Sequence, residues 1–249
     1  MKITIDPRFR INYASFYIKG LWDAVGVNNV KFDSKPFLKD NLYSDIIDYN
    51  KCIIFILENG DYKKRVIIDF DDSDKISLKH YNWSDVYAKI NIKENDLSKY
   101  KKTIAIGPSF GINLININTI VILIKVLFIK HKPVNNLIYL KNYFYMQIRR
   151  MPYKSYLKSK SENDYIFAIS TLWYDPLTYK TTNKFRLVFF ESCKRNFNKV
   201  EGGFFYIKGE SILRQFPQYI EYKNSYNNLL YTQRVSPKEY LKKTKKSAL

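Results

Sequence analysis

The sequence predicts an α/β protein with a parallel sheet, and the stretch Asp164–Glu210 carries most of this prediction. Its apolar run Ile166–Ile169 has the composition of a buried strand and ends in polar residues. A helical pattern follows from Asn183, a residue type that favours the N-cap position. Glycines after Glu201 then predict a break before a second strand at Phe204–Ile207. This order predicts a βαβ unit with parallel strands and with functional loops at their C-terminal ends.

The first part of the chain carries further strand and helix patterns. Met1–Ile5 alternates as a short strand does, and Tyr13–Val25 has apolar residues at helical spacing. Two β-branched runs follow at Lys51–Leu57 and Arg65–Phe70. An Asn-Gly pair at positions 59 and 60 lies between them and is a strong turn signal. These runs therefore predict a hairpin or two adjacent strands.

A helix, a strand and a glycine-containing loop are predicted next. Tyr81–Asn91 has apolar residues at helical spacing, and Lys102–Ile106 reads as a short strand. The loop that ends this strand contains glycines, which permit a ligand to approach the backbone closely, although a tight turn explains them equally well. The loop residues of interest are Gly107, Ser109, Phe110 and Gly111.

Composition and linker pattern predict two domains. The chain has 249 residues and 46% apolar content, which is enough for real hydrophobic cores. The segment Lys158–Asn163 has linker composition. We therefore expect one domain at 1–160 and another at 161–249.

Charge is distributed unevenly along the chain. The formal net charge is +19, and Leu97–Ser161 contains 12 Lys or Arg residues but no Asp or Glu. An AT-biased genome would enrich lysine generally, but it would not explain so long a segment without an acid. The basic residues alternate with apolar stretches, and no zinc-finger spacing, RNP motif or helix-turn-helix pattern is present, so nucleic acid is not the expected partner. An anionic membrane surface fits this segment better.

Two aspartates stand at the end of a predicted strand. Asp69 and Asp71 form an Asp-x-Asp pattern, which can hold Mg²⁺ or Mn²⁺ through carboxylate oxygens. That would suit a metal-dependent glycosyltransferase of the GT-A type. The run also resembles the first motif of haloacid-dehalogenase-type phosphatases, although Ser73 stands where that motif has Thr or Val. A solvated acidic turn is the third interpretation.

The remaining reactive side chains predict an intracellular protein without a zinc site. Cys52 and Cys193 lie far apart in apolar runs, as buried thiols in a reducing compartment do. Charged residues interrupt the first 20 positions, so no secretory signal peptide is predicted. The two histidines, His80 and His131, offer no zinc-ligand spacing with the cysteines.

Several short motifs occur in an order that resembles bacterial glycosyltransferases of the GT-B type, which build capsule, lipopolysaccharide or related surface glycans. The motifs are Tyr81–Asn91, Gly107–Ile112, the ISTLW run at positions 169–173, Asn183 with Arg186, Cys193 with Lys194, and Val200–Phe204. They cover most of the chain from about Asp69 onward. No single motif is a catalytic signature, so the resemblance depends on their order.

The resemblance implies two Rossmann-like domains, the first for the acceptor and the second for a nucleotide-diphospho-sugar. It implies that 161–249 is only the beginning of the second domain, since a complete one takes about 150 residues and 89 remain. It implies transfer of the sugar to a glycan or lipid-linked acceptor, with no cofactor, in the cytoplasm at the inner face of the cell membrane. The implied donor diphosphate-binding residues are Ser170, Thr171 and Arg186, the implied acceptor loop is Gly107, Ser109, Phe110 and Gly111, and the implied loop near the cleft is Glu201, Gly202 and Gly203.

A metal-independent enzyme of this type must neutralise the leaving diphosphate with cationic side chains and a helix N-terminus. Arg186 is the expected cation and the helix start near Asn183 the expected dipole, while an ion pair of Arg186 with Glu191 or Glu201 is the competing interpretation. Two other functions stay open. One is a non-catalytic, membrane-associated accessory or degenerate protein of the same pathway, and the other is a metal-dependent enzyme that uses Asp69 and Asp71.

Overall fold

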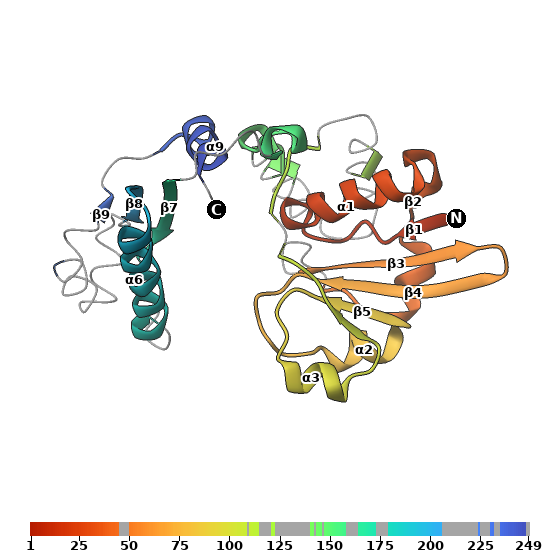
Figure 1. Ribbon diagram of the computed structural model, residues 1–249. Helices are drawn as coiled ribbons and strands as arrows, with labels where there is room; N and C mark the ends of the chain where they lie inside the picture. Colours follow the sequence, from red (N-terminus) through yellow and green to blue (C-terminus); the bar gives the residue numbers. More distant parts are fainter. Residues whose placement is uncertain are drawn as a thin grey trace. The chain divides into compact units, whose positions relative to one another are not determined.

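The computed structural model describes residues 1–44, 50–108, 110–114, 121–122, 140–141, 143–145, 147–157, 164–172, 179–205, 224, 230–231 and 235–247. The chain divides into two compact units, Met1–Tyr153 and Lys154–Leu249 (Figure 1). Each unit combines a sheet with helices, so the predicted α/β class is confirmed. Within the described part of the chain, no helix combines the length and the apolar character needed to cross a membrane.

The N-terminal unit is built on a mixed six-stranded sheet with the order β2-β1-β3-β4-β5-β6. Only β3 runs against its neighbours, and the other pairs are parallel. This arrangement is compatible with a Rossmann-like fold and brings the C-terminal ends of five strands to one edge. The strands are β1 (Lys2–Ile5), β2 (Val30–Phe32), β3 (Cys52–Asn59), β4 (Tyr62–Asp69), β5 (Val86–Lys89) and β6 (Thr103–Ala105).

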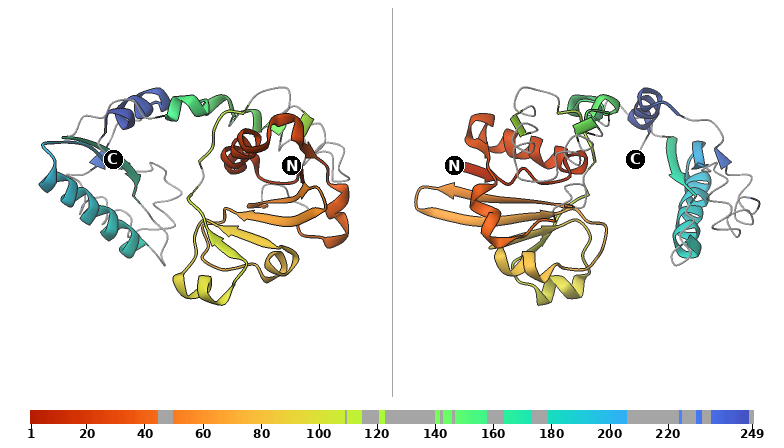
Figure 2. Two further views of the ribbon diagram at one scale, coloured as in Figure 1. Left: turned by 45° about the vertical axis from the view of Figure 1, so that its right-hand side comes forward. Right: turned by 180° about the vertical axis from the view of Figure 1, so that it is seen from behind.

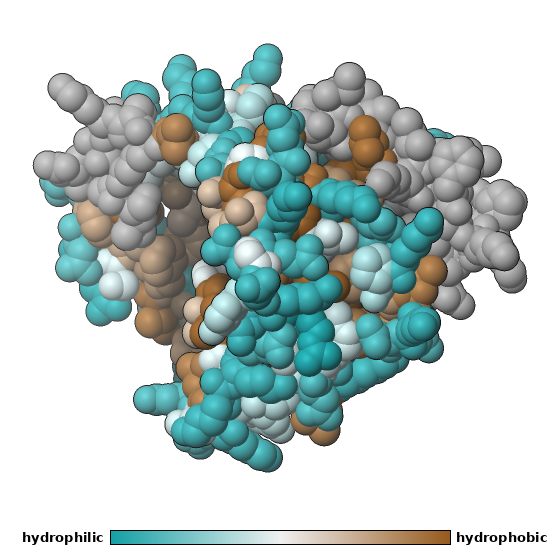
Figure 3. Space-filling view, turned by 90° about the vertical axis from the view of Figure 1, so that its right-hand side faces the viewer, coloured by the Kyte–Doolittle hydropathy of each residue, from teal (hydrophilic) through white to brown (hydrophobic). Residues whose placement is uncertain are grey.

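The predicted hairpin is confirmed as the antiparallel pair of β3 and β4. Gly60 has φ +59° in the turn, a backbone conformation that glycine adopts without steric cost. The first five residues of β3 are buried, whereas β4 is exposed until Val66. The tip of the hairpin therefore projects from the sheet. Seen from the side toward which it points, the N-terminal unit shows mostly hydrophilic residues with hydrophobic ones between them (Figure 3).

Helices cover both faces of this sheet (Figures 1 and 2). The helix α1 (Ile11–Val25) lies on one face, and α2 (Leu78–Trp83) and α3 (Glu94–Lys99) lie on the other. The buried side of α1 carries Ile11, Ala14, Ser15, Ile18 and Trp22, at the spacing that an amphipathic helix requires. Short 3₁₀ helices occur at Val27–Asn29, Lys35–Asp40 and Tyr153–Tyr156.

The predicted helix over Tyr81–Asn91 is wrong in its second half. The helix α2 ends at Trp83, and the chain continues as the parallel strand β5. Three of the four β5 residues are buried, so its apolar residues do not alternate with polar ones as in a strand with one solvated face. Without this alternation, the spacing of apolar residues in the sequence cannot be told from that of a buried helix.

The C-terminal unit contains the predicted βαβ arrangement. The strand β7 (Tyr165–Thr171), the helix α6 (Tyr179–Asn196) and the strand β8 (Lys199–Phe205) follow one another, and β7 pairs with β8 in parallel. A short third strand, β9 (Leu230–Tyr231), continues the parallel sheet. The last helix, α9 (Pro237–Lys246), packs on β7. The backbone N–H of Phe167 donates to Ser247 Oγ at 3.2 Å, directly after α9 ends.

Two details of the predicted βαβ unit are wrong. Asn183 is not an N-cap, because α6 begins at Tyr179 and Asn183 is buried inside the helix. Glu201, Gly202 and Gly203 do not form a break, because they lie inside β8. Glycine is needed at position 202 for strand packing, since a Cβ there would come within 1.8 Å of the Ala168 carbonyl oxygen. The strand therefore begins earlier than the glycines indicated.

Candidate ligand site

The C-terminal unit has a hollow between the C-terminal part of β7 and one side of α6. Its volume is about 320 Å³. It is lined by Ala168, Ile169, Ser170, Phe185, Arg186, Phe189 and Phe190. The structure thus brings together Ser170 and Arg186, two of the three residues predicted to bind a donor diphosphate.

The position of this hollow follows from the topology. Ser170 is the second-last residue of β7, a parallel strand, and ligands of α/β proteins bind at the C-terminal ends of such strands. The helix α6 carries a partial positive charge at its N-terminus, Tyr179, which precedes Arg186 by about two turns. The first turn of α6 contains no acidic residue that would cancel this charge.

Arg186 supplies a permanent cation to the hollow. Burial lowers the pKa of its guanidinium, because a low-dielectric environment disfavours the charged form. The group nevertheless stays protonated at neutral pH, as arginine does in proteins. Its partial burial strengthens its attraction for an anion relative to that of a fully solvated arginine.

The other walls of the hollow are apolar and aromatic. Phe190 is buried against Phe204, with ring centroids 5.5 Å apart, whereas Phe185 is 71% exposed and Phe189 is 43% exposed. One hydroxyl and one guanidinium among phenylalanine rings can hold an anion that is attached to a flat or apolar group. A nucleotide has this combination of parts.

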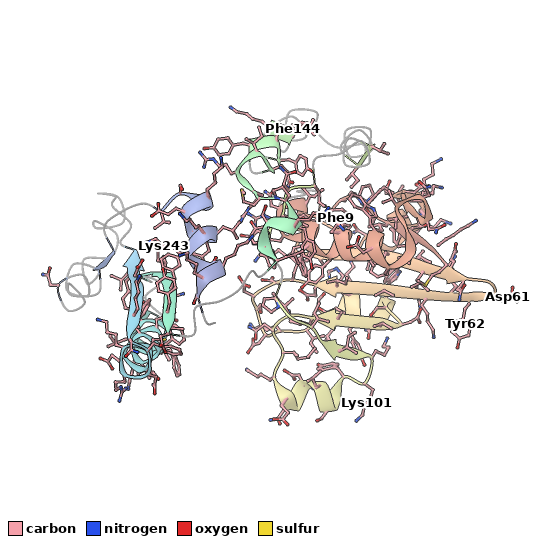
Figure 4. All side chains as sticks on the ribbon, turned by 45° about the horizontal axis from the view of Figure 1, so that its top comes forward. Phe9, Asp61, Tyr62, Lys101, Phe144 and Lys243 are labelled. Atoms are coloured by element: carbon pink, nitrogen blue, oxygen red, sulfur yellow. The ribbon has the colours of Figure 1, made fainter. Side chains whose placement is uncertain are left out.

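The other residues predicted near this site have different positions. Thr171 is the last residue of β7, and its side chain lies outside the described structure. Glu201, Gly202 and Gly203 do not line the hollow. Glu201 binds Lys243 of α9 instead, with its Oε2 2.7 Å from Nζ. Figure 4 labels Lys243 on this helix. The hydrogen bond from Lys243 outweighs partial burial and lowers the pKa of Glu201.

The predicted acceptor loop of the N-terminal unit is held against α1. The Tyr17 hydroxyl donates to the Gly107 carbonyl oxygen at 2.9 Å, and the ring of Phe110 lies 4.8 Å from that of Phe16. Gly111 faces α1 so closely that a Cβ would come within 2.5 Å of the Asn12 carbonyl oxygen. The close approach at Gly111 is therefore one between two parts of the same chain. Ser109 lies outside the described residues.

Asp69 is buried at the C-terminal end of β4, and both of its carboxylate oxygens are engaged. Oδ2 accepts a hydrogen bond from the Tyr87 hydroxyl and lies 3.3 Å from Lys89 Nζ. Oδ1 accepts from the backbone N–H of Asp71 at 2.9 Å. Burial and the nearby carboxylate raise the pKa of Tyr87 well above its usual range, so its hydroxyl remains a donor.

Asp71 is also paired with a lysine. Its Oδ1 lies 3.0 Å from Lys51 Nζ, and Lys89 donates to its backbone carbonyl oxygen at 3.2 Å. Partial burial opposes ionisation, but the hydrogen bond and charge of Lys51 outweigh it and lower the pKa of Asp71. Each of the two aspartates thus has the ammonium group of a lysine within 3.3 Å of one carboxylate oxygen. Among the described residues, no group of three or more His, Cys, Asp or Glu side chains could hold a metal ion.

A second hollow of about 390 Å³ lies beside these aspartates. Its lining includes Tyr43, Asn50, Lys51, Asp71 and His80, and it is more polar than the hollow at Arg186. The sequence did not predict that lysines would lie beside these aspartates. The parallel register of β4 and β5, which pairs Asp69 with Lys89, would have revealed one of them if β5 had been recognised as a strand.

Comparisons of the chain with protein-family models, with curated proteins and with solved structures found no match.

Proposed function

We propose that this protein is a glycosyltransferase of the GT-B type, which transfers a sugar from a nucleotide-diphospho-sugar to a glycan or lipid-linked acceptor of a cell-surface polysaccharide. One observation carries the proposal: Ser170 and Arg186 line the same hollow at the C-terminal end of a parallel strand. The order of the motifs and the presence of two α/β units support it further.

In this proposal, Arg186 neutralises the diphosphate. Negative charge accumulates on the leaving nucleoside diphosphate as the glycosidic bond breaks, and a preorganised cation lowers the energy of that transition state. The Ser170 hydroxyl donates a hydrogen bond to a phosphate oxygen. The aromatic walls formed by Phe185 and Phe189 contact the apolar surface of the nucleotide. The N-terminal unit, with its loop from Gly107 to Gly111, receives the acceptor.

The engaged aspartates favour a reaction without a protein-bound divalent metal over the Asp-x-Asp alternative. Asp69 and Asp71 each have a lysine within 3.3 Å. A metal ion at the same oxygens would have to displace these lysines or bear their repulsion. In the proposed enzyme, these aspartates therefore have a structural role.

Binding of nucleoside diphosphates to the full chain tests the proposal. Isothermal titration calorimetry with UDP, GDP and CDP should give a dissociation constant for at least one of them. Arg186→Ala should weaken this binding by about tenfold or more, because a hydrogen bond to a charged group contributes about 1.5–3 kcal/mol. Arg195→Ala is the matched control: it removes an exposed arginine from the last turn of the same helix and should leave binding unchanged.

The same assay separates the alternatives. Asp71→Asn and a chelator should have little effect on nucleotide binding. If they abolish binding while Arg186→Ala retains it, the metal-dependent alternative replaces this proposal. If no nucleoside diphosphate binds, the chain is a non-catalytic or degenerate protein of its pathway.

A further inference from the structure

A short helical stretch of the N-terminal unit exposes three large apolar side chains on one side. Residues 143–145 and 147–149 are helical. Phe144 is 43% exposed, Tyr145 52% and Ile148 73%. Their spacing of one, three and four residues places them on one face of a helix. Figure 4 labels Phe144 on this segment.

The opposite side of this stretch is fixed to the unit. Tyr143 is 1% exposed, and Gln147 is fully buried. Gln147 Oε1 accepts a hydrogen bond from the backbone N–H of Leu114 at 2.9 Å, and its carbonyl oxygen accepts from Asn113 Nδ2 at 3.2 Å. These bonds set the rotation of the helical stretch. The apolar side chains therefore face outward because the packing of Gln147 requires it.

Basic side chains flank the apolar ones. Lys141 and Arg149 are exposed, and the Arg149 guanidinium carbon lies 3.8 Å from the centroid of the Tyr145 ring, in cation–π geometry. We call Lys141, Phe144, Tyr145, Ile148 and Arg149 the outer face. It belongs to the segment Leu97–Ser161, which has 12 basic residues and no acidic one. No carboxylate of this segment can neutralise the cations of the outer face.

We propose that the outer face docks on an anionic lipid bilayer. Phe144, Tyr145 and Ile148 would insert at the boundary between headgroups and acyl chains, while Lys141 and Arg149 contact lipid phosphates. A partner with phosphates alone, such as a nucleic acid, would match the cations but leave the exposed aliphatic side chain of Ile148 without an apolar environment. This inference does not depend on the proposed function, because it uses no residue of the hollow at Arg186.

Vesicle sedimentation with the full chain provides the test. The wild-type protein should bind vesicles of phosphatidylcholine and phosphatidylglycerol and should bind vesicles of phosphatidylcholine alone much more weakly. Ile148→Glu should reduce binding to the mixed vesicles by about tenfold or more, since it puts a negative charge where the proposed docking inserts an apolar side chain into the bilayer. The matched control is Ile104→Glu, which makes the same change at a 51% exposed isoleucine on the edge strand β6 and should retain binding.

The cations are tested by the double variant Lys141→Gln with Arg149→Gln. Each lost charge should weaken binding to the anionic vesicles by about fivefold. The control is Lys63→Gln with Lys64→Gln, which removes two exposed charges from the β3–β4 hairpin. The control protein should bind the vesicles more tightly than the double variant of the outer face.

Insertion can be observed directly with a polarity-sensitive fluorophore on Ile148→Cys. The two natural cysteines, Cys52 and Cys193, are buried, so the introduced thiol is the accessible one in the described part of the chain. Emission should shift to shorter wavelength when anionic vesicles are added. The same fluorophore on Ile104→Cys should not respond.

Three results would contradict docking of the outer face on a bilayer. If Ile148→Glu and Ile104→Glu bind the vesicles equally, the outer face is not the docking surface. If neither type of vesicle binds and Ile148→Glu converts a dimer to a monomer, the outer face contacts a second copy of the chain. If an oligonucleotide binds and competes with the vesicles, and Ile148→Glu has no effect on either, the basic segment is a nucleic-acid surface.

Discussion

Lys89 and Asp69 form a buried ion pair at the C-terminal edge of the six-stranded sheet, with Nζ 3.3 Å from Oδ2. The parallel register of β4 and β5 sets the two residues side by side. The lysine side chain is fully buried, and that of the aspartate is 8% exposed. A charge in such a position requires its partner, because neither group can be solvated by water instead.

Removing one partner of this pair should destabilise the protein strongly. Lys89→Met leaves Asp69 buried without a countercharge, and we expect a loss of about 3 kcal/mol or more in the free energy of unfolding. Urea titration followed by circular dichroism measures this loss. Lys63→Met is the control, because Lys63 forms an exposed pair with Glu58 at 3.0 Å. Its loss should stay below about 1 kcal/mol, and equal losses in both variants would contradict the role of the buried pair.

Gly202→Ala should disrupt the pairing of β7 with β8. Gly202 has φ +116°, and an added Cβ would lie 1.8 Å from the Ala168 carbonyl oxygen. We expect a loss of about 3 kcal/mol or more from strain and steric conflict together. Thermal unfolding measures it. Gly20→Ala is the control and should stabilise the protein slightly. A Cβ at position 20 meets nothing within 4 Å, and alanine is more favourable than glycine inside a helix by about 1 kcal/mol.

The ion pair of Glu201 with Lys243 should make stability depend on pH in the acid range. The pKa of Glu201 is lowered in the folded state by the hydrogen bond from Lys243. Ionised Glu201 therefore stabilises the folded protein fully at pH values above the ordinary glutamate pKa of about 4.3. This stabilisation is lost as the pH falls through the lowered pKa that Glu201 has in the folded state. The contribution is about 1 kcal/mol or less, because the side chains are partly exposed.

Melting temperatures of the wild-type protein and of Glu201→Gln, measured from pH 7 to pH 3, test this dependence. The two curves should be separated at neutral pH and should converge toward pH 3. A constant separation over the whole range would show that the charge of Glu201 is not responsible for it.

Both cysteines should resist thiol reagents in the folded protein. Burial is the main cause that raises the pKa of Cys52 well above its ordinary value, and burial also raises the pKa of Cys193. The reactive thiolate is therefore scarce as well as inaccessible. Ellman's reagent at pH 8 should react slowly with the native chain and rapidly with two thiols after denaturation. Rapid reaction of one thiol in the native state would contradict the buried position of that cysteine.

The sequence was a reliable guide where one signal determined local structure. The Asn-Gly pair placed the hairpin of β3 and β4, and the β-branched runs on both sides of it identified the two strands. The strand β7 and the helix α6 were recognised because apolar periodicity changes clearly between them. In these places, the local conformational preferences agree with the final packing.

Errors occurred where a residue's role depends on a neighbour that is distant in sequence. The glycines at 202 and 203 predicted a break in the chain before the second strand, but they lie inside β8. Glycine is required at position 202 because the Ala168 carbonyl on the adjacent strand leaves no room for a Cβ. The apolar spacing in Tyr81–Asn91 predicted a helix, but burial of β5 on both faces produced that spacing.

By itself, the sequence determined the α/β class, the βαβ unit and the segment without acidic residues, because these depend on residue type and on spacing within one element. Only the tertiary structure decided which side chains meet. Strand register placed Lys89 beside Asp69, the return of α6 over β7 placed Arg186 beside Ser170, and the packing of Gln147 turned Ile148 outward. Each of these relationships joins positions far apart in sequence or depends on such a contact, so no local pattern could specify it.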